Sequence, residues 1–245
     1  MARVDGGCLH GSAVDGEAMN GTRRQTSGRQ VLDREAYLRR WRTLHGGVEA
    51  GALVRGWLGG AHTLARPLAG AGVSPALLTL VGAALAVLAA GLAVVGGPTG
   101  AAAVAAGVLL AVAGVFDNLD GAVAVMTGRT SLRGALLDAA CDRVGDAACA
   151  VVLWACGAPA WLVLVAGGLA QLQEYVRARG QGLGVDDVQI VSVAERPVRL
   201  AIAASCAIAT AIVPWLDWAT LGTGVWAVLG VIGFVQVATA VGRRL

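Results

Sequence analysis

Four aspartates, arranged in two pairs, are the residues of this sequence that are best suited to chemistry. Asp117 and Asp120 are three residues apart, and Asp138 and Asp142 are four apart. Residues at these spacings lie on one face of an α-helix, so each pair places two carboxylates side by side. Carboxylate oxygens suit hard divalent cations such as Mg²⁺ or Mn²⁺. The spacing therefore predicts an all-oxygen metal site.

Both pairs lie within long apolar stretches. Of the 245 residues, 56% are hydrophobic and only 14% are charged, against about a quarter charged in a soluble domain. Because about 20 mostly apolar residues cross a bilayer, we expect six transmembrane helices and an all-α, polytopic membrane protein. The expected spans are 74–96, 100–125, 135–156, 159–175, 200–215 and 223–241.

The two aspartate pairs occupy the second and third spans, which a short connection around Gly128 is expected to fold into an antiparallel hairpin. Asp120 precedes Gly128 by eight residues and Asp138 follows it by ten. At about 1.5 Å per residue, the carboxylates reach similar depths near one membrane surface. Each aspartate in a membrane helix costs about 2.5–3.5 kcal/mol, so bound cations are needed to offset the repulsion among four. Carboxylate-held Mg²⁺ keeps positions open for phosphates, which indicates diphosphate chemistry at this surface.

Helix-end ion pairs are the alternative interpretation of these acids. Arg129, Arg133 and Arg143 lie nearby in the sequence. Such pairs would explain one or two acids, but not two in-phase pairs at matching depth.

The arginines predict the orientation of the chain. All 19 basic residues are Arg, and ten precede the first span. The connections 96–100, 157–160 and 214–222 contain none. Because cytoplasmic loops carry the excess of basic residues, we expect both termini and the active site on the cytoplasmic side of the cell membrane.

Three regions are expected along the chain. Residues 1–46 are rich in Gly, Ser and Arg and predict a disordered cytoplasmic tail. Residues 47–72 predict an amphipathic helix in the cytoplasmic interface, with Leu53, Trp57 and Leu64 on one face and an end at Pro67. Residues 73–245 form the six-helix membrane domain, which Ser74 and Pro75 open as an N-cap and first-turn proline.

The aspartates belong to a longer pattern. The run from Asp117 to Asp142 resembles the signature of the CDP-alcohol phosphatidyltransferase family, D-x2-D-G-x2-A-R-x8-G-x3-D-x3-D, with every spacing kept. The matching positions are Asp117, Asp120, Gly121, Ala124, Gly134, Asp138 and Asp142. The resemblance covers roughly residues 50–245. The sequence at 141–143, 174–179 and 195–199 is similar to the branch of the family that makes phosphatidylinositol phosphate in actinobacteria.

This resemblance implies an enzyme of phospholipid biosynthesis. The enzyme would transfer a phosphatidyl-type group from a CDP-activated lipid, such as CDP-diacylglycerol, to a polar alcohol and release CMP. It would act as a homodimer among membrane lipids, without a nucleic-acid partner. The resemblance implies a pair of Mg²⁺ or Mn²⁺ ions, and Asp142 would also be the catalytic general base. The implied metal ligands are Asp117, Asp120, Asp138 and Asp142.

The resemblance also implies two groups of substrate contacts. The CDP-binding residues would be Thr79, Asp120, Gly121, Ala124 and Gly134. Plain helix packing is the alternative for the glycines. The acceptor-binding residues would be Arg177, Arg179, Arg196 and Arg199. Their guanidinium groups suit a phosphate-bearing alcohol such as inositol phosphate or glycerol phosphate, and the alternative is attraction to anionic lipid head groups.

Two positions depart from the family pattern. Val125 replaces the arginine of the signature, and Val237 replaces a basic residue late in the last span. Two alternatives to the enzyme remain, the first because of Val125 and the second because intramembrane carboxylates also mark ion paths. One is a degenerate, non-catalytic lipid- or nucleotide-binding homologue. The other is a divalent-cation transporter, which we favour less because the acids lie near one membrane face.

Overall fold

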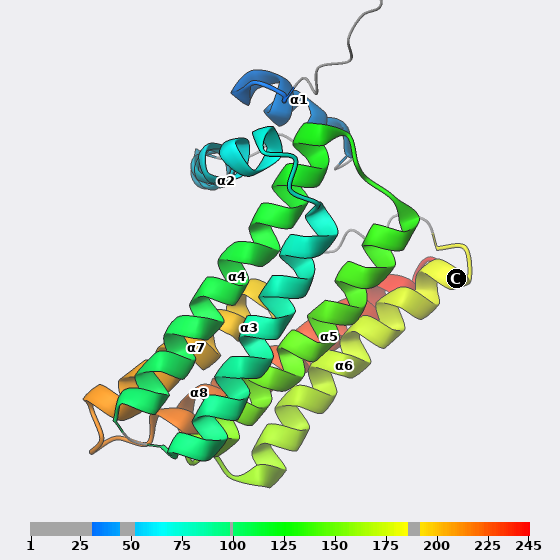
Figure 1. Cartoon of the computed structure of the whole chain (residues 1–245). Helices are drawn as coiled ribbons and strands as arrows, with labels where there is room; N and C mark the ends of the chain where they lie inside the picture. Colours follow the sequence, from blue (N-terminus) through cyan, green and yellow to red (C-terminus); the bar gives the residue numbers. More distant parts are fainter. Residues whose placement is uncertain (1–30, 45–51, 99, 186–191) are drawn as a thin grey trace, which may run out of the picture. The chain divides into compact units, whose positions relative to one another are not determined.

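The computed structural model describes residues 31–44, 52–98, 100–185 and 192–245, which form eight α-helices and no strand (Figure 1). The all-α prediction is confirmed for these residues. The helices are α1 (Arg34–Leu44), α2 (Ala52–Gly70), α3 (Pro75–Gly96), α4 (Ala101–Thr127), α5 (Leu132–Ala155), α6 (Ala160–Gly182), α7 (Arg196–Ile212) and α8 (Trp218–Gly242).

Three of these helices, α3, α4 and α8, are long and apolar enough to cross a membrane. The other three expected spans stay a prediction. Helix α7 has 17 residues, about 26 Å at the helical rise, against about 30 Å of bilayer core. Helices α5 and α6 carry charged residues along their sequences, which lowers their hydropathy.

Clear backbone signals mark the start of α3, the end of α4 and the start of α5. Ser74 has extended backbone angles and Pro75 is the first residue of α3. Gly128 has φ of 67° and ends α4 in a left-handed conformation that glycine adopts without a Cβ penalty. Ser131 then caps α5 by accepting a hydrogen bond from the Gly134 N–H at 3.0 Å.

The expected hairpin of α4 and α5 is wrong in one respect. The two helices run in opposite directions (Figure 1), but α3 packs against both, and few contacts join α4 to α5. The sequence shows that the two helices are consecutive, but not which helix fills the space between them. Because α3 lies between α4 and α5 along much of their length, α4 and α5 do not pack closely on each other. Space therefore remains beside the aspartates.

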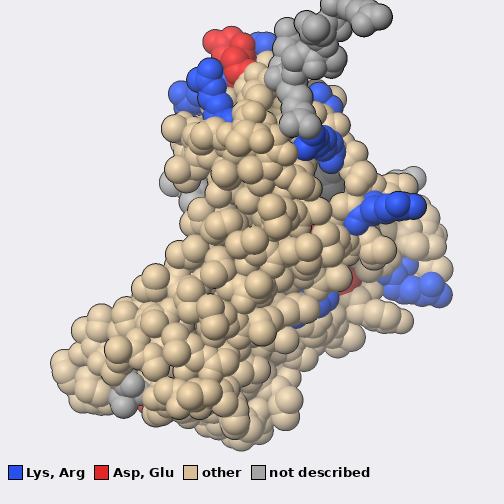
Figure 2. All heavy atoms as spheres, viewed as in Figure 1, with Lys and Arg blue, Asp and Glu red and all other residues tan. Residues whose placement is uncertain are grey.

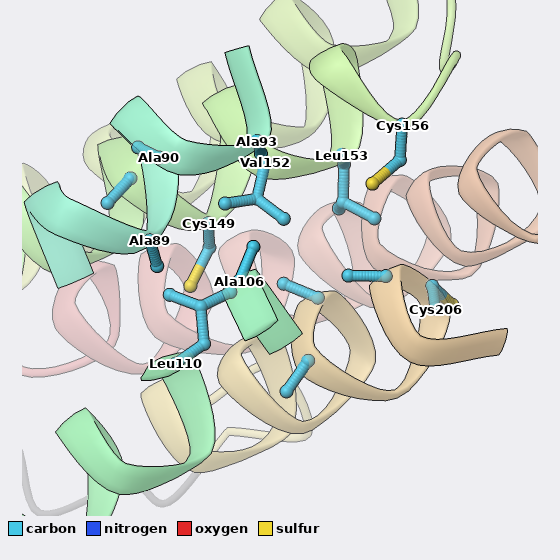
Figure 3. Close-up of a cluster of buried hydrophobic side chains, with 14 of the residues drawn as sticks. Ala89, Ala90, Ala93, Ala106, Leu110, Cys149, Val152, Leu153, Cys156 and Cys206 are labelled. Carbon is cyan, nitrogen blue, oxygen red and sulfur yellow. The ribbon is translucent and has the colours of Figure 1, made fainter. Parts of the chain in front are cut away.

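The core is built from small side chains. Ala89, Ala93 and Ala106 are completely buried, with Leu110 and Val152 among the larger residues around them (Figure 3). Small residues let helix backbones approach closely, which is how membrane helices gain packing energy without a hydrophobic driving force.

A buried ionic chain joins α5, α6 and α7. The Asp146 carboxylate of α5 lies 3.3 Å from Arg199 Nε of α7, and their side chains are 2% and 1% exposed. Arg199 Nη2 lies 3.7 Å from Glu174 of α6. Arg143 reaches the other Asp146 oxygen at 3.2 Å. These contacts fix the three helices relative to one another at the level of Asp146.

The tail prediction is wrong for its last part, because α1 lies within residues 1–46. Tyr37 is 2% exposed and belongs to a buried cluster with Leu58 of α2 and Met126 of α4. Asp33 caps α1 by accepting a hydrogen bond from the Ala36 N–H at 2.7 Å. This tertiary contact stabilises a helix that is too short and polar to form alone. Residues 1–30 lie outside the described residues.

Helix α2 falls within the predicted interfacial helix but continues through Pro67 to Gly70, so the expected end at Pro67 is wrong. A proline close to the C-terminal end interrupts little of the helix beyond it. The side chains of Leu53 and Trp57, and residues 47–51, lie outside what the structure describes, so the amphipathic pattern stays a prediction.

Basic side chains gather at one end of the helices. Figure 2 shows them over α1 and α2 and near the C-terminus, while the opposite end is almost free of charge on this face. Exposed arginines at this end include Arg39, Arg40, Arg66 and Arg129.

We predict that Gly107→Ala destabilises the protein. An added Cβ would lie 2.6 Å from the Ala204 carbonyl oxygen of α7, so backbone must shift, at a cost of about 1–3 kcal/mol. The measurement is the thermal unfolding midpoint in detergent. Gly91→Ala is the matched control, because no atom lies within 4 Å of its Cβ position. Equal midpoints for the two variants would contradict the close α4–α7 contact.

We also predict that Asp146→Ala lowers stability strongly. The change leaves Arg199 buried with one of its carboxylate partners removed, and breaking a buried pair costs about 3–5 kcal/mol. Glu35→Ala is the control, because the Glu35 pair with Arg39 is exposed and such pairs contribute little. Similar unfolding midpoints in both variants would show that the ionic chain does not hold the helices.

Candidate functional site

Three of the four predicted metal ligands come together. One carboxylate oxygen each from Asp117 and Asp120 of α4 and Asp138 of α5 lies within 4.8 Å of the other two. Asp120 is buried, and the other two are partly buried. Helical spacing places the first two on one face, and the α4–α5 connection brings the third to the same depth. These three aspartates are called the carboxylate cluster below.

Thr79 holds one member of this cluster in place. Its hydroxyl, which is buried on α3, donates a hydrogen bond to Asp120 Oδ2 at 2.5 Å. It also reaches the Pro75 carbonyl oxygen one turn earlier at 3.2 Å. A threonine four residues inside α3 therefore orients a carboxylate of α4 across the helix interface.

A pocket of about 190 Å³ opens beside the carboxylate cluster, between α3, α4 and the start of α5. All five residues that the resemblance assigns to CDP line it, together with Asp138. Its lining residues are Pro75, Ala76, Thr79, Asp120, Gly121, Ala124, Arg129, Thr130, Ser131, Gly134, Ala135 and Asp138. Gly121 has no atom within 4 Å of its Cβ position, so helix packing does not require glycine there.

Asp142 lies outside the carboxylate cluster. Its Oδ1 atom is 2.6 Å from Arg196 Nη1 of α7, and the same nitrogen contacts Asp117. Arg196 therefore bridges two of the four predicted ligands. Among the described residues, Arg129, Arg133 and Arg143 form no ion pair with these four aspartates, and Arg143 pairs with Asp146. The alternative of helix-end ion pairs is therefore wrong about which arginines contact the four aspartates.

The carboxylate cluster fits a divalent metal ion. It offers only oxygen atoms, from two helices, within the distances that one or two shared cations can bridge. No cation from the chain is paired with Asp120 or Asp138 in the described residues, so their charge is not neutralised locally. The adjacent pocket leaves space for a phosphate ligand to share the ion.

The other predicted acceptor arginines lie beyond Asp142. Arg177 of α6 pairs with Glu195 at 2.7 Å and with Glu174 at 3.4 Å. Burial acts against ionisation of Glu195, but hydrogen bonds from Arg177 and from the Ser192 N–H lower the pKa of its carboxyl. Arg199 is buried in the ionic chain, whereas Arg179 is exposed. The arginines are therefore held at different depths, with Arg179 at the surface.

The two departures from the family pattern both lie in apolar surroundings. Val125 is 8% exposed in the cluster that contains Tyr37, Leu58 and Met126. Val237 is completely buried with Val185 and Val241. Neither position lines the pocket beside the carboxylate cluster.

Three acids that hold the arginines in place were not among the predicted site residues. Asp146 follows Asp142 by four residues, so the helical spacing that identified the other aspartates would also have identified it. Glu174 and Glu195 both pair with Arg177, which is three residues from the first and 18 from the second. Only the spacing of three is visible as a helical pattern.

Comparisons with known proteins identify the family of this chain. The model of the CDP-alcohol phosphatidyltransferase family matches residues 73–234, about two thirds of the chain. A phosphatidylinositol phosphate synthase of Corynebacterium glutamicum is 40% identical over 53% of this chain and 60% of its own length. An archaetidylinositol phosphate synthase of Aeropyrum pernix is 35% identical over 51% of this chain and 54% of its own length. The matches thus span just over half of these two relatives.

Other relatives match this chain over most of their own length. A phosphatidylinositol phosphate synthase of Mycobacteroides abscessus is 37% identical over 72% of this chain and 80% of its own length. The crystal structure of the Mycobacterium tuberculosis phosphatidylinositol phosphate synthase in complex with manganese and citrate superposes with a TM-score of 0.62 at 30% identity. It aligns over 74% of this chain and 88% of the other. A second structure of that enzyme, with CDP-DAG bound, gives a TM-score of 0.61 at 30% identity, over 74% and 92% of the two chains. With three of its signature aspartates gathered beside a pocket and a family model that matches about two thirds of its length, this chain belongs to the CDP-alcohol phosphatidyltransferase family.

Proposed function

We propose that this protein transfers a phosphatidyl group from CDP-diacylglycerol to a polar, phosphate-bearing alcohol and releases CMP. One observation carries the proposal. The carboxylate cluster opens into a pocket that is lined by every residue assigned to the nucleotide. Positions that are assigned to the metal and to the nucleotide, and that are distant in the sequence, therefore lie beside one another, which supports the proposal.

The chain's own residues have distinct roles in the proposed reaction. Asp117, Asp120 and Asp138 would hold two Mg²⁺ or Mn²⁺ ions with the help of Asp142, which lies outside the carboxylate cluster and contacts Arg196. Thr79 keeps Asp120 oriented. When bound, the ions supply positive charge for the donor diphosphate and for the CMP that departs. Manganese in the M. tuberculosis relative supports this choice of metal.

The transfer itself needs a base. The acceptor oxygen forms a bond to the phosphorus that carries the diacylglycerol, and the bond from that phosphorus to the CMP oxygen breaks. We assign the acceptor proton to the Asp142 carboxylate. Arg196 contacts Asp142 and limits where that carboxylate points. The acceptor therefore binds on the α6–α7 side of the aspartates.

The acceptor phosphate is assigned to the arginines of α6 and α7. Arg177 and Arg199 both pair with Glu174 there, and Arg179 is exposed on α6. Planar guanidinium groups bind phosphate through two parallel hydrogen bonds. Inositol phosphate is the acceptor that we favour, because three of the relatives described above are phosphatidylinositol phosphate synthases. Arg196 would act through the aspartates that it contacts.

We further propose that six helices, α3 to α8, span the membrane, with α2 in the cytoplasmic interface. The basic end in Figure 2 would then face the cytoplasm, in keeping with the excess of arginine in cytoplasmic loops. A mostly apolar groove of about 270 Å³ between α4 and α7 ends at Asp117 and Arg196, and it suits an acyl chain of the donor. Small residues such as Ala147 and Gly168 line a second groove between α5 and α6, which suits a homodimer contact.

The first test is CMP release from CDP-diacylglycerol by the purified protein in lipid, with Mg²⁺ or Mn²⁺. Inositol phosphate, glycerol phosphate, inositol and serine are supplied separately. We expect release with inositol phosphate and a loss of roughly 10²–10⁴-fold in Asp142→Asn, because a general base contributes that much. Binding of CDP-diacylglycerol without release with any acceptor would instead indicate a non-catalytic homologue.

The second test concerns the metal site. Asp138→Asn removes one of the clustered carboxylates and should weaken Mn²⁺ binding by roughly tenfold or more, since even partners of metal ligands contribute that much. Electron paramagnetic resonance of free and bound Mn²⁺ gives the dissociation constant. Asp217→Asn is the control, because Asp217 only caps α8 and asparagine caps helices equally well. Equal Mn²⁺ affinity in both variants would rule out the carboxylate cluster as the metal site.

A further inference from the structure

The family signature has an arginine where this chain has Val125, and the structure shows what occupies that position. Val125 is packed into an apolar cluster with Tyr37 of α1 and Leu58 of α2. It is absent from the lining of the pocket beside the carboxylate cluster. An arginine contact to the donor would therefore have to come from another position.

Arg129 is in position to supply that charge. It follows Gly128, whose left-handed conformation ends α4 and turns the chain back toward the helix. The Arg129 N–H bonds to the Ala124 carbonyl oxygen at 3.1 Å, which holds the residue over the end of α4. Among the described residues that line the pocket, Arg129 alone carries a positive charge.

The Arg129 guanidinium is available to a ligand. Its side chain is exposed, and its hydrogen bond to the Gly72 carbonyl oxygen is long, at 3.5 Å. A bond of this length is weak and easily exchanged for a phosphate oxygen. Thr130, Ser131 and Gly134 line the same part of the pocket at the N-terminal end of α5, where the helix dipole adds partial positive charge.

Two other arginines were candidates for the same role. Arg133 is exposed in the first turn of α5, and Arg243 follows the end of α8. Neither lines the pocket. The place of Arg129 in the pocket lining therefore distinguishes it from Arg133 and Arg243, which the sequence alone does not do.

We propose that the Arg129 guanidinium binds the diphosphate of the CDP-activated donor in this pocket. It would thus take the place of the signature arginine, which is Val125 in this chain. The assignment rests on the proposed function, because it takes the pocket to be the donor site. It identifies a donor-binding residue outside the signature. It also explains how the pocket that Asp120 and Asp138 line keeps a cation without breaking the apolar cluster around Val125.

The test compares Arg129→Gln with Arg133→Gln, a matched neutralisation four residues away in the sequence. Dissociation constants for CDP-diacylglycerol and for CDP are measured with Mn²⁺ on protein in lipid nanodiscs. We expect Arg129→Gln to weaken both ligands by roughly tenfold, as for the loss of a hydrogen bond to a charged group. Arg133→Gln should bind like the unmodified protein. The KM for the donor should rise with kcat nearly unchanged.

Several results would overturn the assignment. Unchanged affinity in Arg129→Gln would do so, and so would weakening for CDP-diacylglycerol but not CDP, which would indicate a lipid contact. If the glutamine variant fails to fold, Arg129→Lys decides. Lysine keeps the charge but loses the planar fork, so affinity should fall roughly threefold, and no change would overturn the proposal. Absence of CDP-diacylglycerol binding by the unmodified protein would overturn this inference and the proposed function together.

Discussion

Negative charge inside apolar helices is the constraint on which this structure depends. A carboxylate in such a helix is costly unless a cation compensates it. The chain meets this requirement in two ways. Asp142 and Asp146 face arginines of α5 and α7, whereas Asp120 and Asp138 lie beside a pocket. The first arrangement stabilises the helices, and the second leaves charge available for a bound metal ion.

Close packing in the apolar part of the bundle keeps these carboxylates at matching depths. Buried alanines along α3 and α4, and Gly107 against the α7 backbone, bring the helices near one another. Because small residues leave little room for adjustment, the charged ends of the helices are held at fixed depths. The Thr79 bond to Asp120 depends on this spacing, since it joins residues 41 positions apart. Packing in the apolar half therefore orients a carboxylate in the polar half.

The distribution of positive charge differs between the two sides that we propose for the substrates. The proposed acceptor side has several arginines, most of them balanced by Glu174, Glu195 or Asp146. The proposed donor side has Arg129 among the described residues lining its pocket. This asymmetry is consistent with a donor whose charge is met mainly by metal ions, and an acceptor that is recognised by fixed guanidinium groups.

The sequence by itself determined the features that repeat at helical spacing. The four signature aspartates, the six apolar segments that became α3 to α8, and the Ser74–Pro75 start of α3 follow from local patterns. Three apolar segments meet the length and hydropathy of a membrane span, and the structure gathers three of the aspartates as expected. Local spacing suffices here because neighbours along one helix face are fixed by the helix itself.

Only the tertiary structure decided which distant residues meet. Arg196 contacts Asp117 across 79 positions, α3 rather than α5 packs along α4, and α1 forms because Tyr37 is buried against other helices. The same holds for Arg129, which is indistinguishable from Arg133 by sequence but lines the pocket. These outcomes depend on which helix faces fit together. That fit is a property of side-chain shape across the whole bundle, and no spacing within a single helix contains it.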